Sequence, residues 1–122
     1  MVRWGLSTCC LFACALASAQ TPPAFVGTWK VTWQGARPLE ARLVVSESGG
    51  TWQTFATSRT DPCVGREVPI AFEEINGDEA TVRLKFSEAL RVCVDITIRI
   101  KKLSEKALAG TRGATVLTIT RD

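Results

Sequence analysis

Strict alternation of apolar and polar residues is the feature that most constrains this chain. From residue 80 to 86, every even-numbered residue is apolar and every odd-numbered residue is polar. The even-numbered residues from 92 to 100 are likewise valine or isoleucine. Successive side chains of a strand point to opposite faces, so this period of two predicts two strands that each bury one face. No segment of the chain shows sustained helical spacing.

Weaker forms of the same pattern predict six further strands, joined mostly by short turns. They cover residues 27–33, 40–46, 51–57, 68–72, 107–112 and 115–121. Asn76-Gly77 predicts a hairpin, because both central positions of a type I′ turn require positive φ. Ser48-Gly49-Gly50 predicts another turn, and Pro69 indicates an edge or a bulge in the fourth strand. The longer connections are 58–65 and 87–91, and the second has room for one helical turn.

Eight antiparallel strands in about a hundred residues must cover their outer edges. An all-β fold, an eight-stranded antiparallel up-and-down β-barrel, does this most simply. A two-sheet β-sandwich is the alternative. An eight-stranded barrel is just wide enough to be filled by side chains or to hold one small ligand.

The N-terminus has the three regions of a signal peptide in order. Arg3 precedes an uncharged, mostly apolar stretch, and Ala17-Ser18-Ala19 offers small residues for cleavage before Gln20. We therefore predict a signal peptide at 1–19 and a single domain at 20–122, exported to the periplasm or secreted. A lipid anchor at Cys14 is the alternative to plain cleavage. The apolar stretch is too short for a membrane span, and no later stretch is long enough.

Cleavage after residue 19 would leave two of the five cysteines, Cys63 and Cys93. In an exported protein two cysteines most simply form one disulfide. Two thiolates without histidine cannot complete a tetrahedral metal site, and the pair lacks the close spacing of a redox motif. We expect a structural disulfide and no metal.

The chain contains no histidine, and this excludes most catalytic designs. Histidine is the most frequent general base, and no nucleophile–base pair can be assembled from the other residues. The net charge of +3 is small and evenly spread, unlike that of a nucleic-acid-binding protein. We expect a protein that is not an enzyme, has no catalytic residues or cofactor and does not bind nucleic acid.

The segment Gly27-Thr28-Trp29 resembles the Gly-x-Trp motif that opens the first strand in the calycin superfamily, which comprises lipocalins, fatty-acid-binding proteins and avidins. The resemblance covers about seven residues and the number of strands. It implies a barrel in which Trp29 packs across the closed end, often under an arginine from a late strand. Arg112 and Arg121 are the candidates for that structural role. The chain lacks tyrosine, which ligand binding in the fatty-acid-binding proteins and avidins uses, and it has no insertion after the first strand.

Trp33 and Trp52 are the candidate ligand-binding residues. Trp33 shares a face with Trp29 but lies four residues further along, about 13 Å away on an extended strand. We therefore expect an exported binding protein whose barrel mouth takes a small apolar or aromatic ligand. The alternative is an exported protein-binding module, such as a protease or lysozyme inhibitor. A third interpretation is that these aromatic residues only fill the core.

Overall fold

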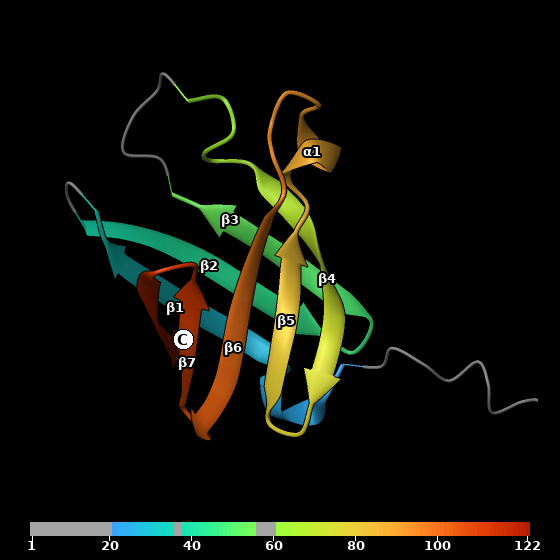
Figure 1. Ribbon diagram of the computed structural model, residues 1–122, viewed down its shortest axis with the longest axis vertical. Coiled ribbons are helices and arrows are strands. Elements are labelled where there is room, and N and C mark those ends of the chain that lie inside the picture. The colour runs from blue at the N-terminus through green and yellow to red at the C-terminus, as the bar shows by residue number, and fades with distance from the viewer. Residues whose placement is uncertain (1–20, 36–37, 56–60) are drawn as a thin grey trace, which may run out of the picture.

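The computed structural model describes residues 21–35, 38–55 and 61–122. These residues form eight strands, a short 3-10 helix (η2, Pro23–Phe25) and one turn of α-helix (α1, Phe86–Ala89) (Figure 1). The strands are β1 (Gly27–Gln34), β2 (Pro38–Ser46), β3 (Gly49–Thr54), β4 (Glu67–Asn76), β5 (Glu79–Leu84), β6 (Ile96–Ser104), β7 (Ala107–Arg112) and β8 (Thr115–Arg121).

Each strand pairs antiparallel with the next one, and β8 pairs with β1 to close the barrel. The closing seam has four residue pairs, from Trp29↔Arg121 to Thr32↔Thr118. The predicted all-β, eight-stranded up-and-down barrel is therefore confirmed, and the alternative of a two-sheet sandwich is wrong.

The inward-facing residues of the eight strands form one hydrophobic core. Their alternation with outward-facing residues follows the period read from the sequence, as in β5, where Ala80, Val82 and Leu84 are buried. The largest fully buried side chains are Trp29, Phe25, Leu43, Leu84, Ile98, Ile100 and Ile119. These side chains fill the interior of the barrel, beginning at the end where Phe25 of η2 lies.

The two ends of the barrel differ in their covering. Helix η2 and the β4–β5 hairpin lie at the lower end in Figure 1, whereas α1 and the β3–β4 connection lie at the upper end. A disulfide between Cys63 and Cys93 joins the β3–β4 connection to the segment before β6, with a Cα–Cα distance of 5.8 Å. This confirms the predicted pairing.

The sixth strand begins later than its alternation suggests. β6 starts at Ile96, and Val92 and Val94 lie in the preceding loop with exposed fractions of 72% and 78%. The bridged Cys93 is the buried residue of this loop, and its N–H donates to Leu90 O. The disulfide and this turn hold the loop, so the two valines point outward instead of continuing the strand.

The fourth strand contains a bulge, but not at Pro69. Pro69 pairs with Thr51 inside a closed sheet, so it does not mark an edge. The register shifts between Phe72 and Glu74. Glu73 and Glu74 consequently both lie exposed, although simple alternation would place them on opposite faces.

Phe86 also departs from the predicted strand, since β5 ends at Leu84 and Phe86 begins α1. It stays buried because the single helical turn packs back over the barrel. The predicted turn at residues 48–50 is shorter than expected, and Gly49 and Gly50 belong to β3.

The predicted signal peptide, its cleavage site and Cys14 lie outside the described residues. Within those residues, no helix is long and apolar enough to cross a membrane.

Candidate functional site

Trp29 closes the lower end of the barrel. Its side chain is fully buried, and its indole N–H donates to the carbonyl oxygen of Phe25 at 2.9 Å. Phe25, on η2, is also fully buried and stacks on Phe72 at 5.9 Å between ring centroids. The segment before β1 therefore folds under the barrel and fills this end with aromatic rings.

Arg121 covers Trp29 from the last strand. Its guanidinium carbon lies 4.2 Å from the centre of the indole, and its Nη1 and Nε donate to Val26 O at 3.0 Å and Glu105 O at 2.9 Å. Gly27 has a φ of +143°, and a Cβ there would collide with the Arg121 guanidinium. Glycine at position 27 therefore suits both the positive φ and the Arg121 side chain that passes over β1 at this point.

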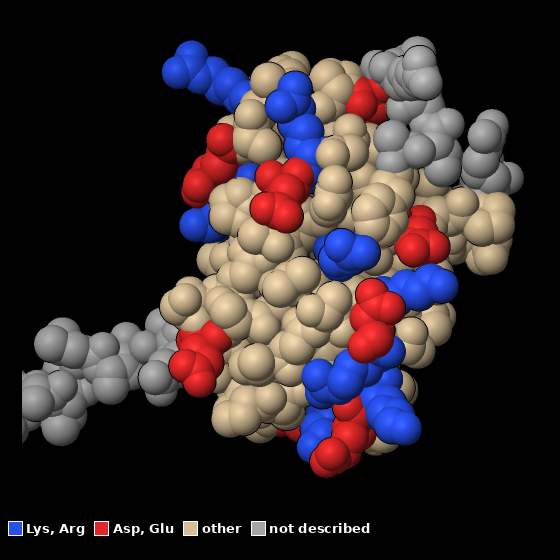
Figure 2. Space-filling view, turned by 180° about the vertical axis from the view of Figure 1, so that it is seen from behind, with Lys and Arg blue, Asp and Glu red and all other residues tan. Residues whose placement is uncertain are grey.

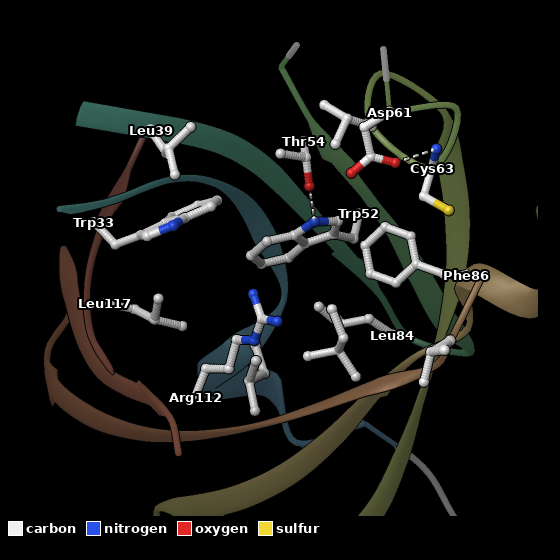
Figure 3. Close-up of a pocket in the computed structure, with 14 residues that line it drawn as sticks. Trp33, Leu39, Trp52, Thr54, Asp61, Cys63, Leu84, Phe86, Arg112 and Leu117 are labelled. Carbon is white, nitrogen blue, oxygen red and sulfur yellow. Dashed lines mark hydrogen bonds between the residues drawn. The ribbon is translucent and has the colours of Figure 1, made fainter. Parts of the chain in front are cut away.

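A pocket of about 350 Å³ opens at the opposite end (Figure 3). This lies at the small end of the range for ligand pockets, about 300–1,000 Å³. Its apolar walls come from six of the eight strands and from α1. They are formed mainly by Trp33, Leu39, Trp52, Leu84, Phe86 and Leu117.

Trp33 and Trp52 meet in this pocket. Their ring centroids are 6.1 Å apart, and the rings are tilted by 31°. The indole N–H of Trp52 donates to the Thr54 hydroxyl at 2.7 Å, which fixes the orientation of its ring. Trp52 is buried, whereas Trp33 is only partly buried. Two indoles at this distance form one continuous aromatic wall, because the gap between them is too narrow for another ring.

The disulfide-linked loops form the rim of the pocket. Asp61, Cys63 and Val64 contribute from the β3–β4 connection, and Val94 from the loop before β6. The Asp61 carboxylate accepts the backbone N–H of Cys63 at 2.9 Å. The Cys63–Cys93 bridge therefore ties together two loops that border the same opening.

Arg112 lies at this upper end, far from Trp29. It is the last residue of β7, and it follows Leu108 and Gly110 in the inward-facing row of that strand. Of the two arginines considered for the position above Trp29, the structure places Arg121 there and puts Arg112 in the wall of the pocket. The alternation of residues 108, 110 and 112 indicates the inward facing of Arg112, but not the end of the barrel at which it lies.

One carboxyl group near the rim has a shifted pKa. Asp95 Oδ1 accepts the Ser87 hydroxyl at 2.7 Å and the Ser87 backbone N–H at 2.9 Å. These two hydrogen bonds, with smaller contributions from Arg83 and Lys85, hold the pKa of Asp95 below its usual value. The contacts fasten the start of α1 to the loop before β6.

Charged side chains of both signs are interspersed on the outer surface of the described strands. On the face seen in Figure 2, basic and acidic side chains lie next to one another. On β4 and β5, Arg83 forms a 2.6 Å ion pair with Glu73. Among the described residues, no three histidine, cysteine or acidic side chains come together to hold a metal ion.

Comparisons of the chain with protein-family models, with curated proteins and with solved structures found no match. The closed eight-stranded antiparallel barrel is compatible with a calycin-like fold.

Proposed function

We propose that this protein is an exported, non-enzymatic binding protein of calycin-like type, which takes a small apolar or aromatic ligand into the mouth of its barrel. The pocket beside Trp33 and Trp52 is the observation that carries this proposal. Small-molecule sites are concave and mostly apolar, with a few polar groups that fix orientation. This pocket has that composition.

The contrast between the two ends of the barrel supports this proposal. At the lower end, Trp29 is fully buried and hydrogen-bonded, as expected for a residue that only stabilises the fold. At the upper end, Trp33 is partly buried and borders open space. Export is supported by the disulfide, because such bridges persist in oxidising compartments.

A pocket-filling variant tests the proposal. Ile96 lines the pocket, whereas its neighbour Thr97 lies on the outer face of β6. N-phenyl-1-naphthylamine, an uncharged dye that fluoresces in apolar surroundings, should bind the native protein at one site. Ile96→Trp should abolish this binding, and Thr97→Trp should preserve it. Absence of saturable binding to the native protein, or equal binding by both variants, would reject the pocket as the site.

A protein-binding module, such as a protease or lysozyme inhibitor, is the second candidate. It is favoured by the exposed Val92 and Val94 on either side of the bridged Cys93. A disulfide-held loop with exposed apolar residues is a suitable contact surface for a protein. Val92 does not line the pocket, so Val92→Asp should abolish inhibition of a target protease or lysozyme under this candidate, and leave dye binding unchanged under the first.

A further inference from the structure

Arg112 gives the mouth of the barrel a positive charge, and among the described residues it forms no ion pair. We propose that the ligand is an amphipathic carboxylate, with an apolar or aromatic body against Trp33 and Trp52 and its acid group on Arg112. This inference rests on the proposed function and specifies the chemical class of the ligand.

The position of Arg112 follows from the packing of β7. The residue below it in the inward row is Gly110, where a Cβ would lie only 2.7 Å from Ile119 Cδ1. The barrel is therefore filled at the level of Gly110. Arg112 lies two residues further along β7, nearer the mouth of the barrel. Figure 3 shows its guanidinium directed into the pocket between Leu84, Leu117 and Trp52.

The charge of Arg112 has no acidic partner within the protein. All 12 acidic residues of the chain belong to its described part, and none of them forms an ion pair with Arg112. By contrast, Arg121 donates to two backbone carbonyls and stacks on Trp29. Arginine remains charged at all physiological pH values, and its planar fork matches a carboxylate. Apolar walls on several sides of the guanidinium strengthen such a pair.

Asp61 is the other charged residue that lines the pocket, and it favours one orientation of the ligand. Figure 3 shows Asp61 on the opposite side of Trp52 from Arg112, at the rim formed by the β3–β4 connection. Its Oδ1 already accepts the Cys63 N–H. A carboxylate is repelled from this side and attracted to the β7 side, so the acid group should lie at Arg112.

Two ligands that differ only in charge test the inference. 2-Naphthoate and 2-naphthalenemethanol share the same ring system, and their affinities for the full exported protein can be compared by calorimetry. We expect the carboxylate to bind about tenfold more tightly, the effect of one charge-assisted hydrogen-bonded pair at a partly open site. Arg112→Gln should remove this preference without weakening the alcohol, and Arg112→Lys should retain part of it.

Arg99→Gln is the matched control, because it makes the same change of charge on the exposed face of β6. It should leave both affinities unchanged. Asp61→Asn should leave carboxylate binding equal or tighter.

The outcomes separate the two proposals. Equal binding of the two ligands by the native protein, or an equal loss of both in Arg112→Gln, would overturn the inference and leave the apolar pocket in place. Weaker carboxylate binding in Asp61→Asn would also contradict it. Failure of both ligands to bind the native protein would reject the proposed function, and the inference with it.

Discussion

The guanidinium carbon of Arg121 lies 4.2 Å from the centre of the Trp29 indole, at the end of the barrel opposite to the pocket. This contact joins β8 to β1 at the end of the barrel that Trp29 closes. The same Trp29–Arg121 pair is the first of the four residue pairs in the β1–β8 seam.

Replacing Arg121 by methionine should therefore destabilise the fold. The change removes the contact with Trp29 and two hydrogen bonds to backbone carbonyls, together worth about 1–3 kcal/mol at this exposed position. Arg112→Met, at the mouth, should change stability by only about 0.5 kcal/mol. Urea unfolding of both variants measures the difference. Equal losses would mean that Arg121 does not secure the closure of the barrel.

Ile98 and Thr97 test the facing of β6. Ile98 is buried in the core, and Thr97 is exposed beside it on the same strand. Ile98→Ala should cost about 2–5 kcal/mol, because it leaves a cavity. Thr97→Ala should stay within about 0.5 kcal/mol. If chemical denaturation gave similar values for the two variants, the register of this strand would be wrong by one residue.

The architecture was predictable from the sequence wherever alternation was regular. The even-numbered residues of 80–86 are all buried, and the closed barrel follows from the number of strands and the need to cover their edges. The pairing of Cys63 with Cys93 was predictable because these are the two cysteines that follow the predicted signal peptide.

Alternation failed where long-range contacts decide the conformation. Val92 and Val94 continue the apolar pattern of Ile96, yet the disulfide at Cys93 holds their segment in a loop. The bulge after Phe72 shifts the parity of β4, and no local residue signals it.

The candidate site was predictable in part. Trp33 and Trp52 were identified as ligand-binding candidates, and the structure brings them together in one pocket. The facing of Trp52 could not be read from its own segment, which mixes polar and aromatic residues without a clear period. Its pairing with Leu43 on β2 determines that facing. The choice between Arg112 and Arg121 likewise depended on which end of the barrel each strand reaches.

Loss of the disulfide should weaken the fold without changing its sheet. The bridge closes a loop of 30 residues and, by restricting the unfolded chain, contributes about 3–4 kcal/mol. Cys63→Ser with Cys93→Ser should lower the free energy of unfolding by that amount, with an unchanged far-ultraviolet circular dichroism spectrum.

Native exported protein should contain no titratable thiol and should begin at Gln20 by intact mass. A free thiol in that material would contradict the disulfide.

The pKa of Asp95 predicts a loss of stability in acid. Because the folded protein holds this pKa below its unfolded value, ionised Asp95 stabilises the fold above about pH 4. This contribution disappears as the pH falls through the lower folded pKa. Asp95→Asn, which can still accept from Ser87, should therefore show a smaller decline in stability between pH 7 and pH 3 than the native protein. Parallel declines in urea titrations at the two pH values would exclude a role for this carboxylate.

The central claim is that the upper end of the barrel binds a ligand while the lower end stabilises the fold, and Trp33→Ala tests it most directly. Titration of this variant with 2-naphthoate, together with its thermal unfolding, should show affinity reduced more than about tenfold and a modest loss of stability. Trp29→Ala should instead cost about 3–5 kcal/mol of stability. If Trp33→Ala unfolded the protein as severely as Trp29→Ala, or bound the carboxylate as tightly as the native protein, the aromatic wall would be core packing and the claim would be wrong.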